Sequence, residues 1–201
     1  MIAIVDYGVG NLFSLASSLK AIGVDSVVTG DKKVIEQADK LILPGVGAFG
    51  DASFKLKSSG LDVVIKEQVK NDKPLLGVCL GMQMLFEKSY EYGEYEGLGL
   101  IKGKVIAIDL PKEYKIPHIG WNALELVKQS PILKYITQND HVYFVHSYHA
   151  VDCSESLVAT TEYGKQITAI VQSGKVYGCQ FHPEKSGDVG LKILKAFCEE
   201  K

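Results

Sequence analysis

The chain has 201 residues, a formal net charge of −2 and 22 basic residues, all of them lysines. A balance this close to neutral disfavours a nucleic-acid-binding protein, which would present a basic face. Without arginine there is no bidentate guanidinium clamp for phosphate, so we expect any phosphorylated substrate to be held by another polypeptide. A domain of this length buries roughly 70% of its unfolded surface without needing a disulfide or metal. We therefore predict a single domain over residues 1–201.

Cysteine usage and hydropathy indicate the compartment. The four cysteines have no paired spacing, which is typical of a reducing environment. The chain opens directly into the apolar run Ile2–Val5, and no apolar stretch approaches the length of a membrane span. We expect a cytoplasmic protein without a membrane partner.

Strand-like and helix-like segments alternate along the first half of the chain. We predict strands over Ile2–Tyr7, Asp25–Thr29, Lys40–Leu43 and Leu75–Val78. We predict helices from an Asn11 cap to Gly23, over Lys32–Ala38, and over Ala52–Lys70 with a break near Ser58–Gly60. This alternation is typical of an α/β fold with a mostly parallel sheet and helices on both faces.

The second half is richer in strands and is predicted to be partly antiparallel. The expected strands are Val105–Ile108, Val142–Val145, Leu157–Thr161, Ile167–Val171 and Val176–Phe181. A helix over Val189–Glu199 closes the chain, and Tyr90–Gly99 is the most loop-like stretch.

Cys79 is the first candidate catalytic residue. It lies in a Gly-x-Cys-x-Gly turn, Gly77–Gly81, between the apolar run Leu75–Val78 and the segment Met82–Phe86, which we predict to be helical. This is the strand–turn–helix setting of a nucleophile elbow, with sulfur in place of oxygen. The partial positive charge at the start of the helix favours the thiolate. From the turn alone, the alternative is that Cys79 has no catalytic role and is a small buried apolar residue.

His182 and Glu184 are the expected base and orienting acid. Side chains two apart in a strand share a face, so these two are predicted to lie together and Cys179 to face away. Pro183 favours an extended backbone at His182. Glu184 can hold one ring nitrogen while the other takes a proton from Cys79. Taken singly, His182 could be a structural histidine and Glu184 a solvated surface charge.

These motifs resemble those of the class I glutamine amidotransferases. The resemblance extends over nearly the whole chain and is closest to the branch that supplies ammonia in histidine biosynthesis. The segments that carry it are Gly77–Gly81 and Phe181–Glu184, together with Asp6–Leu12, Leu43–Phe49, Pro117–Asn122 and Tyr143–Tyr148. It implies the three-layer fold of that family and hydrolysis of glutamine through a γ-glutamyl thioester, with no cofactor.

The resemblance also assigns roles around the triad. The backbone N–H of Leu80 and one from the Gly45-Val46-Gly47 loop are expected to form the oxyanion site. We hypothesise that this loop rests turned away and flips when a partner binds, because its glycines cost little to rotate. Gln83 and the backbone of Ser147 and Tyr148 are expected to bind the amino-acid end of glutamine.

A second subunit is expected because ammonia is soon protonated in water and the chain is too short to include a synthase. The resemblance implies a (β/α)₈-barrel cyclase that binds the phosphorylated ribulosyl substrate and forms a heterodimer with this chain. Candidate interface residues are Asn11, Trp121, Tyr143 and Lys185, since aromatic side chains are enriched at interface anchors. Burial in the core is the alternative for the two aromatic residues.

Two patterns are misleading. Gly45–Gly50 matches Gly-x-Gly-x-x-Gly, but it follows the third strand and lacks the acidic residue of a dinucleotide site. His146 and His149 are three apart, which in one strand places them on opposite faces, and no acidic or cysteine ligand accompanies them. We expect no metal site.

Three other functions remain open. The chain could be a glutaminase that serves a different synthase, although the Pro44–Gly47 loop disfavours this. It could be a cysteine peptidase or γ-glutamyl hydrolase with the same triad, which a peptide substrate would identify. It could also be a catalytically silent binding domain, which the intact Cys–His–Glu set disfavours.

Overall fold

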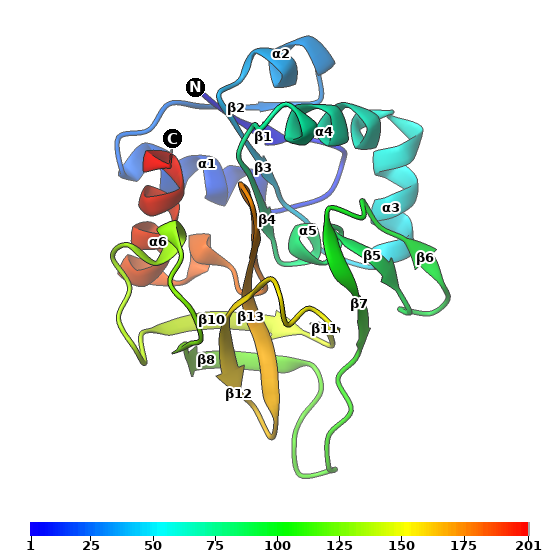
Figure 1. Ribbon diagram of the computed structural model, residues 1–201, viewed down its shortest axis with the longest axis vertical. Coiled ribbons are helices and arrows are strands. Elements are labelled where there is room, and N and C mark those ends of the chain that lie inside the picture. Colours follow the sequence, from blue (N-terminus) through cyan, green and yellow to red (C-terminus); the bar gives the residue numbers. More distant parts are fainter. Residues whose placement is uncertain (201) are drawn as a thin grey trace.

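The computed structural model describes residues 1–200, so Lys201, the last residue of the predicted domain, lies outside them. At the centre is an eight-stranded sheet with the order β2-β1-β3-β4-β14-β13-β12-β9 (Figure 1). The first five strands of this order run parallel to their neighbours, whereas β13, β12 and β9 continue the sheet antiparallel. The predicted α/β fold, with its partly antiparallel C-terminal half, is confirmed.

The first half of the chain alternates strands and helices as predicted. Its strands are β1 (Ile2–Val5), β2 (Ser26–Thr29), β3 (Lys40–Leu43) and β4 (Leu75–Val78). Its helices are α1 (Leu12–Ala21), α2 (Lys32–Gln37), α3 (Phe49–Ser58) and α4 (Leu61–Lys70). The predicted break between the last two is confirmed. It falls at Gly60, whose φ of 68° lies in the left-handed region that glycine tolerates.

The second half contains more strands than predicted. The main sheet takes β9 (Glu125–Leu126), β12 (Leu157–Glu162), β13 (Gln166–Ser173) and β14 (Val176–Cys179). A four-stranded sheet contains β5 (Phe86–Ser89), β6 (Tyr95–Glu96), β7 (Ile101–Ala107) and β11 (Tyr148–Val151), and a separate pair contains β8 (His118–Ala123) and β10 (His141–His146). The remaining helical elements are α5 (Leu80–Gln83), η1 (Pro131–Leu133), η2 (Pro183–Lys185) and α6 (Gly187–Glu199). Sequence patterning missed β5, β6, β8, β9 and β11.

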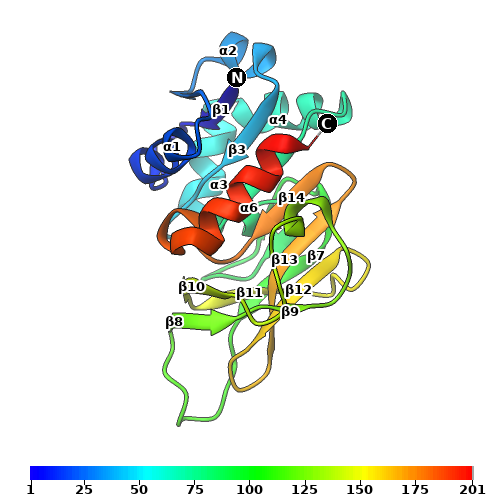
Figure 2. The same cartoon turned by 90° about the vertical axis from the view of Figure 1, so that its left-hand side faces the viewer.

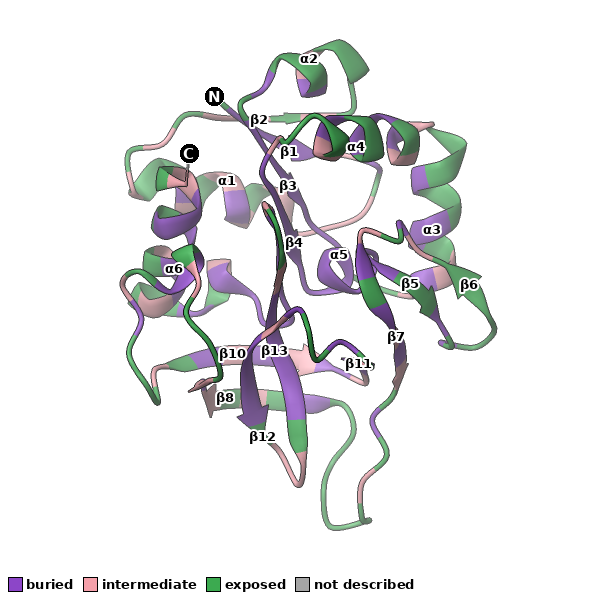
Figure 3. Ribbon diagram, in the orientation of Figure 1, coloured by how far each residue is buried: buried purple, intermediate pink, exposed green. Residues whose placement is uncertain are grey.

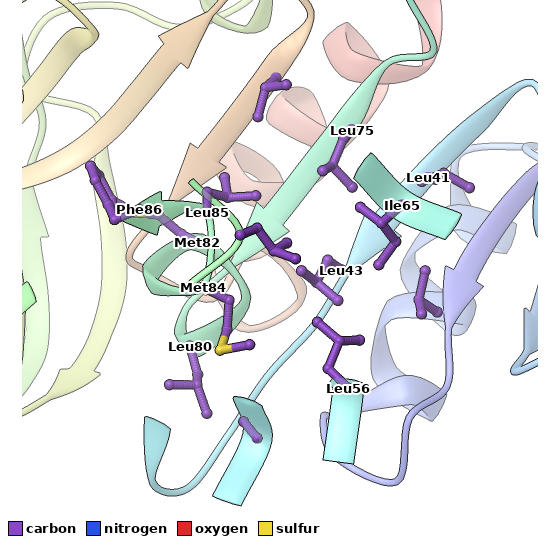
Figure 4. Close-up of a cluster of buried hydrophobic side chains, with 14 of the residues drawn as sticks. Leu41, Leu43, Leu56, Ile65, Leu75, Leu80, Met82, Met84, Leu85 and Phe86 are labelled. Carbon is purple, nitrogen blue, oxygen red and sulfur yellow. The ribbon is translucent and has the colours of Figure 1, made fainter. Parts of the chain in front are cut away.

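The two faces of the parallel sheet bury two separate apolar clusters. Alternate side chains of a strand point to opposite faces, so Leu41 and Leu43 pack with α2, α3 and α4, whereas Ile42 packs with α1 and α6. Figure 4 shows part of the first cluster around Leu43 and Leu75. Figures 1 and 2 show the helices on the two sides of the sheet, and Figure 3 shows the buried strands between partly exposed helices. None of the helices within residues 1–200 is both long and apolar enough to cross a membrane.

The predicted helix over Met82–Phe86 is wrong. α5 ends at Gln83, and β5 begins at Phe86. The carbonyl groups of Met84, Leu85 and Phe86 accept hydrogen bonds from backbone amides of residues 98–101 instead of continuing a helix. Long-range pairing therefore overrides the local helical pattern.

The predicted side-chain cap at Asn11 is also wrong. Asn11 occupies the N-cap position of α1 but makes no capping hydrogen bond with its side chain. Its amide instead contacts Glu184, at the far end of the sequence.

Candidate active site

Cys79 lies on a tight turn between β4 and α5. Its backbone has φ 55° and ψ −113°, a strained conformation for a residue with a side chain. The turn closes because Gly77 and Gly81 leave room for the backbone. A Cβ atom on Gly81 would lie 1.8 Å from the Leu43 carbonyl oxygen, and one on Gly77 would lie 2.7 Å from the Gly81 oxygen. This strained strand–turn–helix geometry is that of a nucleophile elbow.

The helix after the elbow is shorter than predicted. α5 spans only Leu80–Gln83, so its aligned peptide dipoles are those of a single turn. Leu80 is the first residue of this turn, and its backbone N–H has no partner within the helix. It is therefore free to donate to a group that enters beside the Cys79 sulfur.

His182 and Glu184 form a buried hydrogen-bonded pair. Nδ1 of His182 lies 2.8 Å from Oε1 of Glu184, and the two side chains are 3% and 1% exposed. The alternation argument that predicted this pairing is wrong, because β14 ends at Cys179 and Glu184 lies in η2. The 3₁₀ turn that starts at Pro183 brings Glu184 back against the ring.

The environment of His182 favours its protonated form. Burial alone lowers the pKa of His182, but hydrogen bonds and Coulombic interactions with Cys79 and Glu184 outweigh it and raise the pKa to about 10. The raised pKa of His182 favours a protonated ring beside the sulfur. Cys179 differs, since it is fully buried and burial raises the pKa of its thiol well above the ordinary value.

Most of the predicted site residues line one cavity. It has a volume of about 380 Å³, and its walls include Cys79, His182, Leu80, Gln83, Val46, Gly47, Ser147, Tyr148 and Lys185. Cleft volumes of this order suit a small ligand. A larger hollow of about 740 Å³ between Leu126 and Ile136 shares no lining residue with this cavity and contains none of the predicted site residues.

The glycine loop packs directly on the elbow. A Cβ atom on Gly45 would lie 2.7 Å from the Gly81 nitrogen and 2.8 Å from Cβ of Leu80. The preceding carbonyl, of Pro44, accepts a 2.7 Å hydrogen bond from the Tyr7 hydroxyl. Beyond this fixed point Val46 is 40% exposed, and Gly47, with φ 89°, has open space around it. The start of the loop is therefore fixed to the elbow, whereas Val46 and Gly47 line the cavity.

Gln83 lies at the end of a chain of side-chain amides. Its Nε2 donates to the Tyr148 carbonyl oxygen (3.1 Å) and to Oε1 of Gln180 (3.0 Å). Nε2 of Gln180 in turn lies 3.8 Å from the Cys79 sulfur. Gln180 is fully buried, and sequence reasoning missed it. The available signal was a polar amide in an apolar strand pattern two residues before His182.

Glu91 is a second residue that sequence reasoning missed. It lies in the segment Tyr90–Gly99, which was predicted to be the most loop-like stretch, yet Glu91 is only 9% exposed and lines the cavity. Its Oε2 accepts a 2.7 Å hydrogen bond from the backbone N–H of Phe49, at the start of α3. Burial raises the pKa of this carboxyl, partly offset by that hydrogen bond. Glu91 thus adds an acidic group to the cavity that Cys79 lines.

The four predicted interface residues lie in or beside the His182–Lys185 turn. Trp121 and Tyr143 face each other across the β8–β10 pair, with ring centroids 6.0 Å apart, and Trp121 is 54% exposed. The His182 N–H donates to the Tyr143 carbonyl (3.0 Å). Asn11 donates to Oε1 of Glu184 (3.3 Å), and Lys185 is exposed at the cavity rim. Each of the four therefore reaches His182 or Glu184 either directly or through one intervening residue.

His118 and His146, near the cavity, have hydrogen-bond partners, whereas neither ring nitrogen of the buried His149 has one among residues 1–200. Nδ1 of His146 lies 2.8 Å from the Tyr148 carbonyl oxygen and Nε2 lies 3.0 Å from Nδ1 of His118. Burial lowers the pKa of His146 to about 3. His146 and His149 belong to different strands, so the argument that placed them on opposite faces of one strand is wrong. Among residues 1–200, no group of three or more His, Cys, Asp or Glu side chains is arranged to hold a metal ion.

Comparisons with known proteins agree with this geometry. The family described as glutamine amidotransferase class-I matches residues 3–200. The imidazole glycerol phosphate synthase subunit HisH of Caldanaerobacter subterraneus subsp. tengcongensis is 52% identical over 200 residues, which cover 99% of this chain and 98% of the relative. The HisH subunit of Lactococcus lactis subsp. lactis has the same identity and coverage. In fold, a crystal structure of a glutamine amidotransferase superposes with a TM-score of 0.77 at 21% identity, covering 98% of this chain and 100% of that one. The chain belongs to the class-I glutamine amidotransferases and, within them, to the HisH subunits of imidazole glycerol phosphate synthase.

Proposed function

We propose that this glutamine amidotransferase hydrolyses glutamine to glutamate and ammonia with Cys79 as nucleophile, His182 as acid and base, and Glu184 as the group that orients His182. The observation that carries the proposal is the strained Cys79 turn beside the buried His182–Glu184 pair, in the wall of one cavity. A thiolate beside an imidazolium is the activated form of a cysteine nucleophile.

The reaction proceeds through a covalent thioester. The Cys79 thiolate attacks the side-chain amide carbon of glutamine, and the C–N bond breaks as His182 donates its proton to the departing nitrogen. Ammonia leaves, and the neutral imidazole then takes a proton from water. The resulting hydroxide attacks the γ-glutamyl thioester, the C–S bond breaks, and glutamate leaves with Cys79 again a thiolate. Glu184 stabilises the imidazolium formed at each turnover.

The tetrahedral oxyanion requires two backbone donors. The Leu80 N–H supplies the first, directly after the nucleophile. The second comes from the Gly45-Val46-Gly47 loop, in which Val46 and Gly47 line the cavity. We infer that this loop turns its N–H toward the oxyanion when a partner subunit binds. The exposure of Val46 and the open space around Gly47 support that freedom.

The amino-acid end of glutamine is held by polar groups that line the same cavity as Cys79. Both hydrogens of the Gln83 amide are already donated to Tyr148 and Gln180, so Gln83 can offer only its oxygen. Together with the Glu91 carboxylate, this oxygen suits the α-ammonium group. Backbone groups of Ser147 and Tyr148 serve the α-carboxylate.

The ammonia passes to a (β/α)₈-barrel cyclase subunit in a heterodimer. That subunit makes imidazole glycerol phosphate and the aminoimidazole carboxamide ribonucleotide of histidine biosynthesis. The proposal is supported by the names of relatives that are subunits of a synthase and by the exposed Trp121 beside the triad turn. We further propose that residues 1–201 form one domain and act in the cytoplasm.

A glutamine analogue with an electrophilic side chain tests this function directly. Incubation should attach one analogue to Cys79, identified by peptide mass spectrometry, and free glutamine should protect against it. Labelling of a different residue, or labelling that a peptide substrate blocks and glutamine does not, would contradict the proposal and favour a peptidase.

A further inference from the structure

Gln180 occupies an unusual position for a neutral polar side chain. It is completely buried, and its backbone N–H is already satisfied by the Ala169 carbonyl oxygen at 2.9 Å. Its side chain extends between Gln83 and the sulfur of Cys79. A buried amide costs free energy unless both of its ends have partners. Whether the amide points its oxygen or its nitrogen toward Cys79 therefore decides whether the sulfur faces an acceptor or a donor.

The hydrogen-bond network determines which way both amides point. The Tyr148 carbonyl can only accept, so the Gln83 atom 3.1 Å away must be the nitrogen Nε2. That same nitrogen lies 3.0 Å from the Gln180 amide, which must then present its oxygen to accept. The other end of Gln180, 3.8 Å from the Cys79 sulfur, is consequently an N–H donor. Reversing either amide would bring two donors or two acceptors together.

We propose that Gln180 is a catalytic residue that donates its Nε2–H to the sulfur of Cys79 and stabilises the thiolate. Its orientation is imposed by the Tyr148 carbonyl through Gln83. This inference rests on the proposed role of Cys79 as nucleophile. Cys79 is only 7% exposed, and an anion with little access to water depends on nearby donors. His182 supplies one such group, and Gln180, which like His182 follows the C-terminal end of β14, supplies a second.

The chain of amides also joins the two ends of the substrate site. Gln83 faces the amino-acid end of glutamine, whereas Cys79 attacks the side-chain amide. Gln180 connects the two through one hydrogen bond on each side. Loss of Gln180 should therefore affect thiolate reactivity first and substrate affinity second.

The test compares two variants of the full chain with a matched control. Gln180→Met removes both the oxygen and the nitrogen of the side-chain amide while keeping a similar length. Gln180→Glu keeps an oxygen for Gln83 but places an oxygen instead of a donor toward the sulfur. Gln172→Met alters a partly exposed glutamine on β13 whose amide donates to the Gly174 carbonyl. Iodoacetamide alkylation of Cys79 is followed by mass spectrometry at about pH 7 and again at about pH 10, where most thiols are ionised.

Alkylation at pH 7 should slow about tenfold in Gln180→Met, because the thiolate loses one hydrogen bond to a charged group. It should slow further in Gln180→Glu. The rates should converge with wild type at pH 10, which a merely blocked or distorted site would not do. Gln172→Met should match wild type throughout. A folded Gln180 variant that alkylates at the wild-type rate at pH 7, or that stays slow at pH 10, would overturn the inference.

A measurement on the unaltered protein covers the case in which neither variant folds. Side-chain amide NMR signals of Gln180 and Gln83 should both shift when Cys79 is capped as a methyl disulfide. Unmoved signals would overturn the inference. Failure of the proposed function is distinguishable from this outcome: it would appear as a wild-type protein that reacts at Cys79 but never hydrolyses glutamine, with or without its partner.

Discussion

Nδ1 of His182 lies 2.8 Å from Oε1 of Glu184, although the strand that leads to them ends at Cys179. The 3₁₀ turn η2, rather than a shared strand face, makes this contact. Glu184 therefore holds one nitrogen of the ring, while His182 and Cys79 line the same cavity.

Glu184→Gln should lower kcat for glutamine hydrolysis by about 10²- to 10⁴-fold, because the imidazolium loses its stabilising carboxylate. It should also lower the pKa of His182 from about 10, since Glu184 is one of the groups that raise it. His182 must carry a proton when ammonia leaves, so the fall of kcat at high pH should begin at lower pH in the variant. Glu67→Gln, at an exposed position on α4, is the control. Equal pH profiles for wild type and Glu184→Gln would contradict the orienting role.

Cys79→Ala should reduce glutamine hydrolysis by at least about 10⁴-fold while leaving the fold intact, because no other group can form the thioester. The comparison variant is Cys179→Ala, which removes a fully buried thiol that hydrogen bonds only to the Gly77 carbonyl. It should lose stability and keep turnover per folded molecule. Glutamate release together with circular dichroism separates the two effects. Retained turnover in Cys79→Ala would exclude Cys79 as the nucleophile.

Gly81→Ala should destabilise the protein by more than about 3 kcal/mol, because the added methyl group would lie 1.8 Å from the Leu43 oxygen on a neighbouring backbone. Gly47→Ala should cost only about 1–2 kcal/mol, from its positive φ, since the space around Gly47 is open. Urea unfolding measures both. Equal losses of unfolding free energy in the two variants would show that close packing is not the reason for glycine at position 81.

Much of this site could be anticipated from the sequence, and the failures have physical causes. The Gly-x-Cys-x-Gly turn predicted the elbow because only glycine fits where Gly81 meets β3. The helix predicted from the local pattern failed at Met84–Phe86 because the carbonyl groups there accept hydrogen bonds from backbone amides of residues 98–101. Glu91 and Gln180 were missed because their importance comes from burial and from partners far along the chain, which no local period encodes.

Glu91→Gln should raise KM for glutamine about tenfold near neutral pH, because an ion pair with the α-ammonium becomes a neutral hydrogen bond. Burial raises the pKa of Glu91, so its carboxylate gains a proton at a higher pH than an ordinary glutamate. As pH falls, the wild-type KM should therefore rise earlier than for an exposed acid, whereas the variant's KM should stay flat. Glu94→Gln, in the same segment but exposed, is the control. A pH-dependent KM in Glu91→Gln would assign the titration to another group.

Ammonia production at Cys79 for a second subunit is the central part of the proposed function. Glutamate release from glutamine should be measured for the chain alone, with a barrel cyclase, and with the cyclase plus an analogue of its ribulosyl substrate. The expected result is slow hydrolysis by the chain alone, large stimulation by the cyclase with its analogue, and loss of all activity in Cys79→Ala. Hydrolysis that is absent under every condition, or that persists without Cys79, would contradict the account.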